Sequence, residues 1–167
     1  MRYGMLTNTR RSWSKIGKRA VLPHRHGFEN HYLFSALAPE SGESFHLMGI
    51  DKMDSTMTHV FLEKLKEKHP NEHVVLVWDN APCHRPQWVK DIDGLTVIPL
   101  PPYSPELNPP ERFFEEIRRD TANRVFDSLA DIETRISAAV NRWADDLSAM
   151  KKLIGYEWIL KQLREVN

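Results

Sequence analysis

The chain has 167 residues, of which 41% are hydrophobic and 28% charged, and its formal net charge is zero. Its mean hydropathy is −0.52, and no apolar stretch approaches the roughly 20 residues that a membrane-spanning helix needs, so the composition argues against a membrane protein. The single cysteine, Cys83, excludes an internal disulfide and favours a reducing compartment, so we expect a cytoplasmic protein. A chain of this length is large enough to form one domain around a real core.

Basic residues are concentrated at the start of the chain. Residues 1–28 contain seven Lys or Arg and no Asp or Glu, whereas the remaining residues contain 16 Lys or Arg and 23 Asp or Glu. Tyr3 and Trp13 are interleaved with the basic side chains, as in many surfaces that contact nucleic-acid phosphates. A solvated loop that happens to be basic is the alternative interpretation. The basic residues are Arg2, Arg10, Arg11, Lys15, Lys18, Arg19 and Arg25.

The first half of the chain shows strand patterns, then a helix, then another strand. Met1–Met5 is short enough to be the end of a strand whose beginning is absent. The segments 30–39 and 44–50 are strand-like and are joined by a turn, which predicts a hairpin. Asp54 is a suitable N-cap for an amphipathic helix that ends near Lys68. The apolar run Val74–Trp78 does not alternate, so we expect a central parallel strand that is buried on both faces.

The second half is richer in helix patterns. The order of hairpin, helix, strands and helices predicts a mixed sheet flanked by helices. The expected elements are a short helix over 88–91, a strand over 95–100, a helix over 109–123, a long helix after a capping box formed by Ser128 and Asp131, and a last helix over 151–165 that is interrupted at Gly155.

Asp79 follows the apolar strand directly, and in open α/β sheets ligands bind beyond the carboxyl ends of such strands. Asp79 and Asn80 could equally begin an ordinary turn. His84 lies five residues further on and is either a structural histidine or a polar residue of the same site. The eight histidines and one cysteine show no zinc spacing.

Glu111 is the second candidate carboxylate. The order Asn108-Pro109-Pro110-Glu111 is typical of a helix start, so Glu111 could complete a capping box with Asn108. A carboxylate in a first helical turn is also held in one position and can still face a metal. Because Asp79 and Glu111 offer hard oxygen ligands, they favour Mg²⁺ or Mn²⁺.

Two motifs together resemble a known family. The first is the segment 79–84, Asp-Asn-Ala-Pro-Cys-His, and the second is the segment 100–111, Leu-Pro-Pro-Tyr-Ser-Pro-Glu-Leu-Asn-Pro-Pro-Glu. They resemble the catalytic domain of mariner-type DDE transposases, and most closely its bacterial insertion-sequence branch. Thirty-one residues separate Asp79 from Glu111, which is close to the family's spacing. The resemblance covers most of the chain and is weakest after about Asp145.

The resemblance implies an RNase-H-like α/β fold over residues 1–167, with a five-stranded mixed sheet flanked by helices and an incomplete first strand. It implies three acidic residues that hold two metal ions, Mg²⁺ or Mn²⁺. Asp79 matches the family's second acid and Glu111 its third, with Asn80, His84 and Asn108 as supporting polar residues. Arg2, Arg10, Arg11, Lys15, Lys18 and Arg19 would contact the DNA backbone.

The sequence departs from this pattern at its start. The family's first acid precedes the segment that here begins at Arg2, so we expect the first acid and the helix-turn-helix DNA-binding region to lie upstream of Met1. Asp51 ends the third expected strand. In the RNase-H-like strand order it would lie about 10 Å from the first acid's place and about 14 Å from Asp79, at about 4.8 Å per strand. We therefore expect no substitute for the missing acid.

The implied activity is metal-dependent DNA cleavage and strand transfer at transposon ends, impaired in this chain. The expected partners are transposon-end and target DNA and, because two ends must be paired, a second copy of the chain. We therefore expect the protein to associate with the nucleoid in a bacterial cytoplasm. A non-catalytic remnant that binds DNA or dimerises with an intact transposase is the alternative. A nuclease that acts on RNA–DNA hybrids is a third possibility, against which the proline-rich motif argues.

Overall fold

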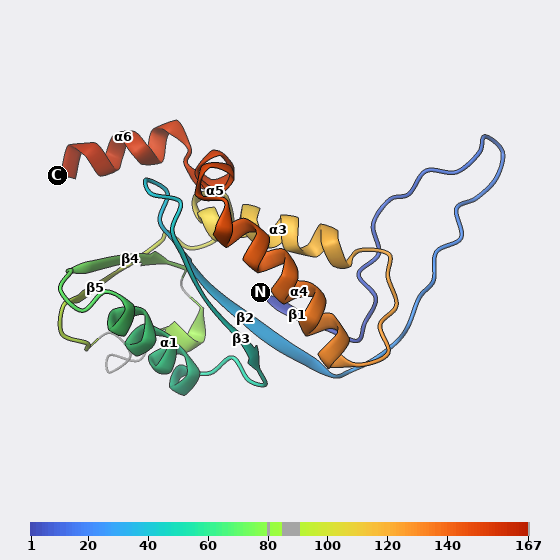
Figure 1. The fold of residues 1–167 in the computed structure, drawn as a ribbon, viewed down its shortest axis with the longest axis horizontal. Coiled ribbons are helices and arrows are strands. Elements are labelled where there is room, and N and C mark those ends of the chain that lie inside the picture. The colour runs from blue at the N-terminus through green and yellow to red at the C-terminus, as the bar shows by residue number, and fades with distance from the viewer. Residues whose placement is uncertain (80, 85–90, 167) are drawn as a thin grey trace.

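A computed structural model describes residues 1–79, 81–84 and 91–166 of the chain. Five strands and the helices around them form the body, and a long loop projects from one side (Figure 1). The expected helix over 88–91 falls mostly outside the described residues. The elements are β1 (Arg2–Gly4), β2 (Asn30–Leu37), β3 (Ser44–Ile50), α1 (Ser55–Lys68), β4 (Val74–Trp78), the 3₁₀ turn η1 (Pro82–His84), β5 (Leu95–Pro99), the 3₁₀ turn η2 (Pro105–Leu107), α3 (Pro109–Thr121), α4 (Leu129–Asp145), α5 (Leu147–Ile154) and α6 (Glu157–Val166).

The first three strands form an antiparallel sheet in the order β1-β2-β3. The predicted hairpin is confirmed, with Leu37 opposite Ser44 next to the turn and Tyr32 opposite Ile50 at the far end. The register shifts between Tyr32 and Phe34, where the hairpin has an irregularity. Only three residues of β1 pair with β2, opposite Asn30, His31 and Tyr32. Along the rest of β2, the edge that faces away from β3 has no neighbouring strand among the described residues.

β4 and β5 form a separate parallel pair, with Val77 opposite Ile98. The five expected strands are therefore present, but they are hydrogen-bonded as a group of three and a group of two. The prediction that β4 is central and buried on both faces is wrong. α1 covers one face of the pair, while Val75 and Val77 on the other face are 57% and 47% exposed. Among the described residues, β4 has only β5 as a neighbouring strand.

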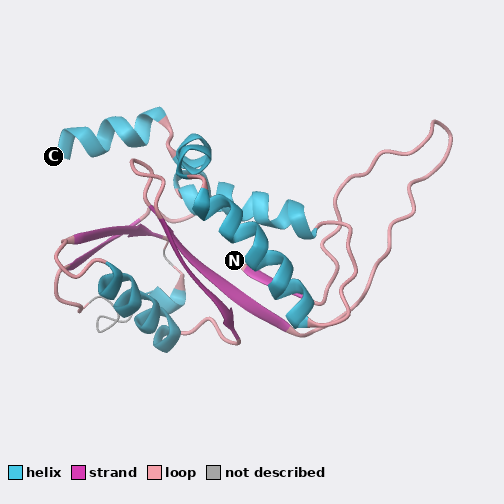
Figure 2. Ribbon diagram, viewed as in Figure 1, coloured by secondary structure: helices cyan, strands magenta, loops and turns pink. Residues whose placement is uncertain are grey.

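Helices cover the two faces of the strands differently, as Figures 1 and 2 show. α3, α4 and α5 pack on one face of the β1–β3 sheet, and α1 lies on the other side, against β4 and β5. The first core includes Leu33, Phe113 and Ile136, and the second includes Phe61 and Trp78. Burying these large side chains supplies most of the driving force for folding.

Local signals set most of the helix boundaries. Asp54 caps α1 by accepting a hydrogen bond from Met57 N, as predicted. The capping box of Ser128 and Asp131 is formed at the start of α4. The interruption at Gly155 is also confirmed, since α5 ends at Ile154 and α6 begins two residues after Gly155. None of the described helices is long and apolar enough to cross a membrane.

Candidate active site

Asp79 lies at the point where β4 leaves the sheet. Its Oδ1 accepts a hydrogen bond from Ala81 N at 3.0 Å, and His84 Nδ1 lies 3.0 Å from the same oxygen. Asp79 thus begins a turn, as one of the two interpretations of the sequence held, and its side chain is still 54% exposed. Oδ2 has no hydrogen-bond partner among the described residues, so one carboxylate oxygen is available to a ligand.

His84 is held in place by its neighbours. Its imidazole stacks on the Trp78 indole, with 4.1 Å between ring centroids and 7° between the planes. Nδ1 lies 3.0 Å from both the backbone oxygen and Oδ1 of Asp79, so this nitrogen is the donor. Burial alone would lower the pKa of His84, but its hydrogen bonds to Asp79 and Cys83 outweigh burial and raise the pKa to about 9. The same hydrogen bond is the main reason that the pKa of Asp79 is lowered. The pair is therefore an imidazolium and a carboxylate at neutral pH.

Cys83 is a member of this group that sequence reasoning missed. Its thiol is buried, and burial raises its pKa, but hydrogen bonds with His84 and Thr58 act in the opposite direction and the net pKa is lowered. The adjacency of Cys83 and His84 in the sequence is the signal that could have indicated this contact. Thr58 comes from α1, so the site is tied to the helix that covers the inner face of β4.

The proline-rich loop forms the opposite wall of the site. A cavity of about 500 Å³ lies between the turn after β4 and this loop. Tyr103 is fully exposed in the loop and has a φ of 60°, a conformation that is costly for a residue with a Cβ. Tyr103 lies within the motif at 100–111, where the pattern alone does not indicate a role for it. The lining residues are Asp79, Ala81, Leu100, Pro101, Pro102, Tyr103 and Ser104.

Glu111 lies in the first turn of α3, as predicted, but it does not cap the helix. Asn108 is at the N-cap position, yet its side chain makes no capping hydrogen bond, and Glu111 N bonds instead to the Asn108 backbone oxygen at 3.0 Å. The proposed capping box is therefore wrong. Glu111 Oε2 lies 3.9 Å from Arg118 NH1, and the side chain is 41% exposed. A carboxylate that caps nothing and faces solvent remains available for a ligand.

The amino group of Met1 interacts electrostatically with both carboxylates. It donates a hydrogen bond to Leu33 O at 2.6 Å. Its pKa is lowered to about 6, chiefly by burial, while the negative charges of Glu111 and Asp79 act to raise it and that of Arg118 lowers it. The charges of Asp79 and Glu111 therefore both act on the Met1 amino group.

The donor set suits a hard divalent cation in kind, because Asp79 and Glu111 each offer carboxylate oxygen and each is partly open to solvent. Among the described residues, no group of three or more His, Cys, Asp or Glu is placed to hold a metal ion. Asp51 is engaged elsewhere: its Oδ1 lies 2.9 Å from His31 Nε2, and His31 Nδ1 lies 2.6 Å from Glu133 of α4.

The other predicted site residues differ in their placement. Asn80 lies outside the described residues. Arg2 is exposed in β1. Arg10 is held against α3, with NH1 3.8 Å from Glu115 Oε1, so it is partly engaged within the fold. Four further basic residues are exposed on the long loop and have no side-chain partner among the described residues; they are Arg11, Lys15, Lys18 and Arg19.

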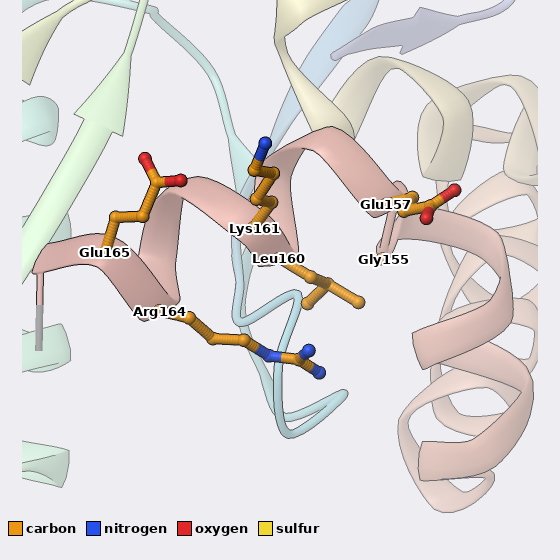
Figure 3. A pocket seen from close by; sticks show the side chains of 6 residues that line it. All are labelled: Gly155, Glu157, Leu160, Lys161, Arg164 and Glu165. Carbon is orange, nitrogen blue, oxygen red and sulfur yellow. The ribbon is translucent and has the colours of Figure 1, made fainter.

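A second hollow, of about 410 Å³, lies along α6 and is lined by that helix and Gly155 (Figure 3). Charged side chains of both signs line it, including Glu157 and Arg164, and none of its lining residues belongs to the β4 turn or the proline-rich loop. It is separate from the site that contains Asp79.

The fold and the site together define an RNase-H-like α/β protein that carries carboxylates at the end of a strand and at the start of a helix. The chain belongs to the family of DDE superfamily endonucleases, whose pattern matches residues 4–133. The family resemblance seen in the sequence is therefore confirmed. A relative from Sinorhizobium fredii (strain NBRC 101917 / NGR234), uncharacterized protein y4pE/y4sA, is 31% identical over 129 residues, which cover 76% of this chain and 95% of that protein.

Solved structures of Mos1 transposase complexes share the fold. The paired-end complex with left transposon end has a TM-score of 0.59 at 16% identity and covers 93% of this chain. The strand transfer complex has a TM-score of 0.59 at 18% identity and covers 90% of this chain. The pre-cleavage transpososome has a TM-score of 0.61 at 14% identity and covers 93% of this chain. This chain spans about half the length of each Mos1 chain, at 53%, 52% and 54% respectively.

Proposed function

We propose that residues 1–167 form the catalytic domain of a DDE transposase, which cleaves DNA strands at transposon ends and transfers them to target DNA. The observation that carries this proposal is the placement of two partly exposed carboxylates, Asp79 directly after β4 and Glu111 in the first turn of α3, whose charges both act on the amino group of Met1. Membership of the DDE endonuclease family supports it. Mos1 transposase, whose fold this chain shares, has been solved in a paired-end complex with the left transposon end.

Asp79 and Glu111 would hold Mg²⁺ or Mn²⁺, and a cation bound there would supply Lewis-acid stabilisation of charge on the phosphate oxygens. His84 keeps the Asp79 carboxylate ionised and fixes its rotamer through the Nδ1 hydrogen bond. Asn80 and Asn108 are proposed as supporting polar residues. The rigid prolines of the loop limit the movement of Glu111 relative to β4.

The DNA backbone would contact the basic residues of the first 28 positions. Arg11, Lys15, Lys18 and Arg19 are exposed and carry charge outward from the body. Arg2 and Arg10 would add contacts nearer the sheet, although Arg10 also pairs with Glu115. Because the working reaction joins paired ends, we propose a homodimer on DNA, associated with the nucleoid.

A second candidate function is non-catalytic DNA binding or dimerisation. It is favoured by the small number of ligands, because the described residues offer two carboxylates at the site and no group of three metal-binding side chains. Two carboxylates bind a divalent cation more weakly than three. Catalysis by this chain is therefore expected to be slow.

The test is a supercoiled-plasmid nicking assay with Mn²⁺, combined with a gel shift on the same DNA. Slow nicking that is abolished by Asp79→Ala, with DNA binding unchanged, supports the catalytic proposal. Binding that survives both Asp79→Ala and chelation of the metal, without any nicking, supports the second candidate. A chain that neither binds nor nicks DNA contradicts the catalytic proposal and leaves only dimerisation of the second candidate, and fast nicking contradicts the expected impairment.

A further inference from the structure

Tyr103 occupies a position in the proline-rich loop that the fold itself does not favour. Its side chain is fully exposed, so it contributes to neither hydrophobic core. Its φ of 60° lies in the left-handed region, where a Cβ is costly and glycine is the usual residue. Among the described non-glycine residues, Asn123 alone shares a positive φ, and asparagine tolerates that conformation. A strained residue that packs on nothing points to binding rather than to stability.

The loop that carries Tyr103 is anchored at both ends. Before it, Leu100 N donates a hydrogen bond to Trp78 O at 2.7 Å, which ties the loop to the last residue of β4. After it, Leu107 N donates to Ser104 O at 3.1 Å within the η2 turn that leads into α3. Three prolines further restrict the backbone on the two sides of the tyrosine; they are Pro101, Pro102 and Pro105. The aromatic ring is therefore presented to solvent from a restrained backbone.

Tyr103 lines the same cavity as Asp79, which has a volume of about 500 Å³. Pockets of roughly 300–1,000 Å³ commonly hold small organic groups. On the loop side, the apolar residues Leu100, Pro101 and Pro102 line the cavity beside the tyrosine. Among the described lining residues there is no Lys or Arg, so this wall offers no cation to a phosphate. The loop wall therefore suits a flat, uncharged group, while the carboxylate of Asp79 suits a cation.

A nucleobase is the part of DNA that matches the loop wall. Bases stack on aromatic side chains through their π faces, and every base has such a face, so the contact does not depend on sequence. In a paired duplex the neighbouring bases cover both faces. Only a base that has left the stack can therefore offer a face to the tyrosine, and this costs least where the base is already unpaired.

We propose that Tyr103 is a stacking platform for the unpaired base of a nucleotide whose phosphate lies at Asp79. The base would rest on the exposed ring, and the phosphate of the same nucleotide would face the cation that the carboxylates hold. The chain would accordingly prefer DNA in which a nucleotide at the site is unpaired. This inference rests on the proposed function, because it assumes that the substrate is DNA and that Asp79 is a metal ligand.

The experiment uses the full chain and two synthetic duplexes, one fully paired and one with a short central bubble of mismatched nucleotides. Both carry 5-iodouracil at the same central positions, because this base analogue crosslinks on irradiation to an aromatic side chain that stacks on it. Binding is measured with Ca²⁺ as the divalent cation to slow cleavage. The variants are Tyr103→Phe, Tyr103→Ala and Tyr103→Gly. Phe28→Ala is the control, because it removes an equally exposed aromatic ring from the loop between β1 and β2.

We expect the wild type, Tyr103→Phe and Phe28→Ala to bind the bubble about tenfold more tightly than the paired duplex, the factor that stacking on one aromatic ring contributes. Tyr103→Ala and Tyr103→Gly should bind both duplexes equally, with the wild-type affinity for the paired one. The crosslink of the wild type should map to Tyr103. Tyr103→Gly should not lower the Tm, because glycine adopts a φ of 60° without strain, so its lost preference would not reflect a folding defect.

Several results would overturn the stacking proposal alone. Tyr103→Ala that still prefers the bubble is one, and a crosslink that maps to another residue is a second. Equal binding of the two duplexes by the wild type is a third. Loss of the preference in Tyr103→Phe would assign the effect to the hydroxyl group instead of the ring. A change from dimer to monomer in sedimentation of Tyr103→Ala, with the preference intact, would place the ring against a second copy. A wild type that binds neither duplex contradicts the proposed function itself.

Discussion

The imidazole of His84 lies flat on the indole of Trp78, with 4.1 Å between ring centroids and 7° between planes. Trp78 is the last residue of β4 and is buried against α1. Because His84 stacks on this fixed indole, the position of its imidazole is also fixed. His84 in turn directs Nδ1 to the carboxylate of Asp79 at 3.0 Å. The buried core thereby fixes the orientation of an exposed candidate metal ligand.

His84→Ala should weaken metal binding although His84 is not proposed as a ligand. Without the Nδ1 hydrogen bond, Asp79 loses the main interaction that lowers its pKa and holds its rotamer. We expect the Kd for Mn²⁺ to rise by about tenfold, as for other residues that orient metal ligands. Isothermal titration calorimetry measures this. His73→Ala is the control, because His73 directly precedes β4 and its Nε2 contacts Thr96 Oγ1 and not Asp79. Equal Mn²⁺ affinities for the two variants would contradict the prediction.

Glu111→Gln should reduce Mn²⁺ affinity by more than tenfold, because an amide oxygen has no charge to offer a hard cation. The matched control is Glu115→Gln, one turn further along α3, where the carboxylate pairs with Arg119 at 3.5 Å. The Mn²⁺ affinity of Glu115→Gln should equal that of the wild type. The quenching of tryptophan fluorescence by added Mn²⁺ provides an independent readout, and a similar effect of both variants would argue against Glu111 as a ligand.

Stability should fall as the pH drops below about 6.5, in part because of His46. Burial lowers the pKa of His46 to about 4, and Lys68 acts in the same direction. The unfolded chain therefore binds a proton between about pH 6.5 and 4 that the folded chain does not, so the contribution is complete above pH 6.5 and is lost as the pH falls toward 4. A shift of this size corresponds to about 3 kcal/mol at most.

The measurement is urea unfolding of the wild type and His46→Gln between pH 7 and 4.5. The variant should have a flatter dependence of the unfolding free energy on pH, because glutamine does not titrate. His46 also stacks on Phe113 and bonds to Ser35 Oγ, so the variant is expected to be less stable at pH 7. An unchanged slope below pH 6.5 would show that His46 is not the group responsible.

Phe113→Ala should destabilise the fold by about 3–5 kcal/mol, the usual effect of deleting a fully buried aromatic ring. Phe113 is completely buried between α3 and the β1–β3 sheet. Phe28→Ala removes the same atoms from a fully exposed position in the loop between β1 and β2 and should change stability by less than about 0.5 kcal/mol. Chemical denaturation of both variants checks the difference, and similar values would contradict the assignment of the core.

Features set by neighbouring residues could be predicted from the sequence. The hairpin of β2 and β3, the Asp54 cap, the Ser128 capping box and the break at Gly155 all appear in the structure. Each depends on side-chain spacing or on a hydrogen bond within three residues, so no distant contact is needed to specify it. The same is true of the family motifs, which are written within two short segments.

Long-range features could not be predicted in this way. The burial of β4 depends on which elements cover its two faces, and an apolar run cannot reveal that one face is open. The capping box of Asn108 and Glu111 is not formed: the Asn108 side chain makes no capping hydrogen bond, and Glu111 N bonds to the Asn108 backbone oxygen. The exposed Tyr103 and the buried thiol of Cys83 also depend on contacts between the β4 turn, α1 and the proline-rich loop.

The sequence by itself determined the family, the two carboxylates and most of the helices and strands, because these are written in local pattern and composition. Only the tertiary structure decided that Asp79 is held by His84, that Asn108 makes no capping hydrogen bond, and that Ile16 is fully exposed in the loop between β1 and β2. The physical reason is that charge interaction, burial and exposure depend on distances in space between residues that are far apart along the chain.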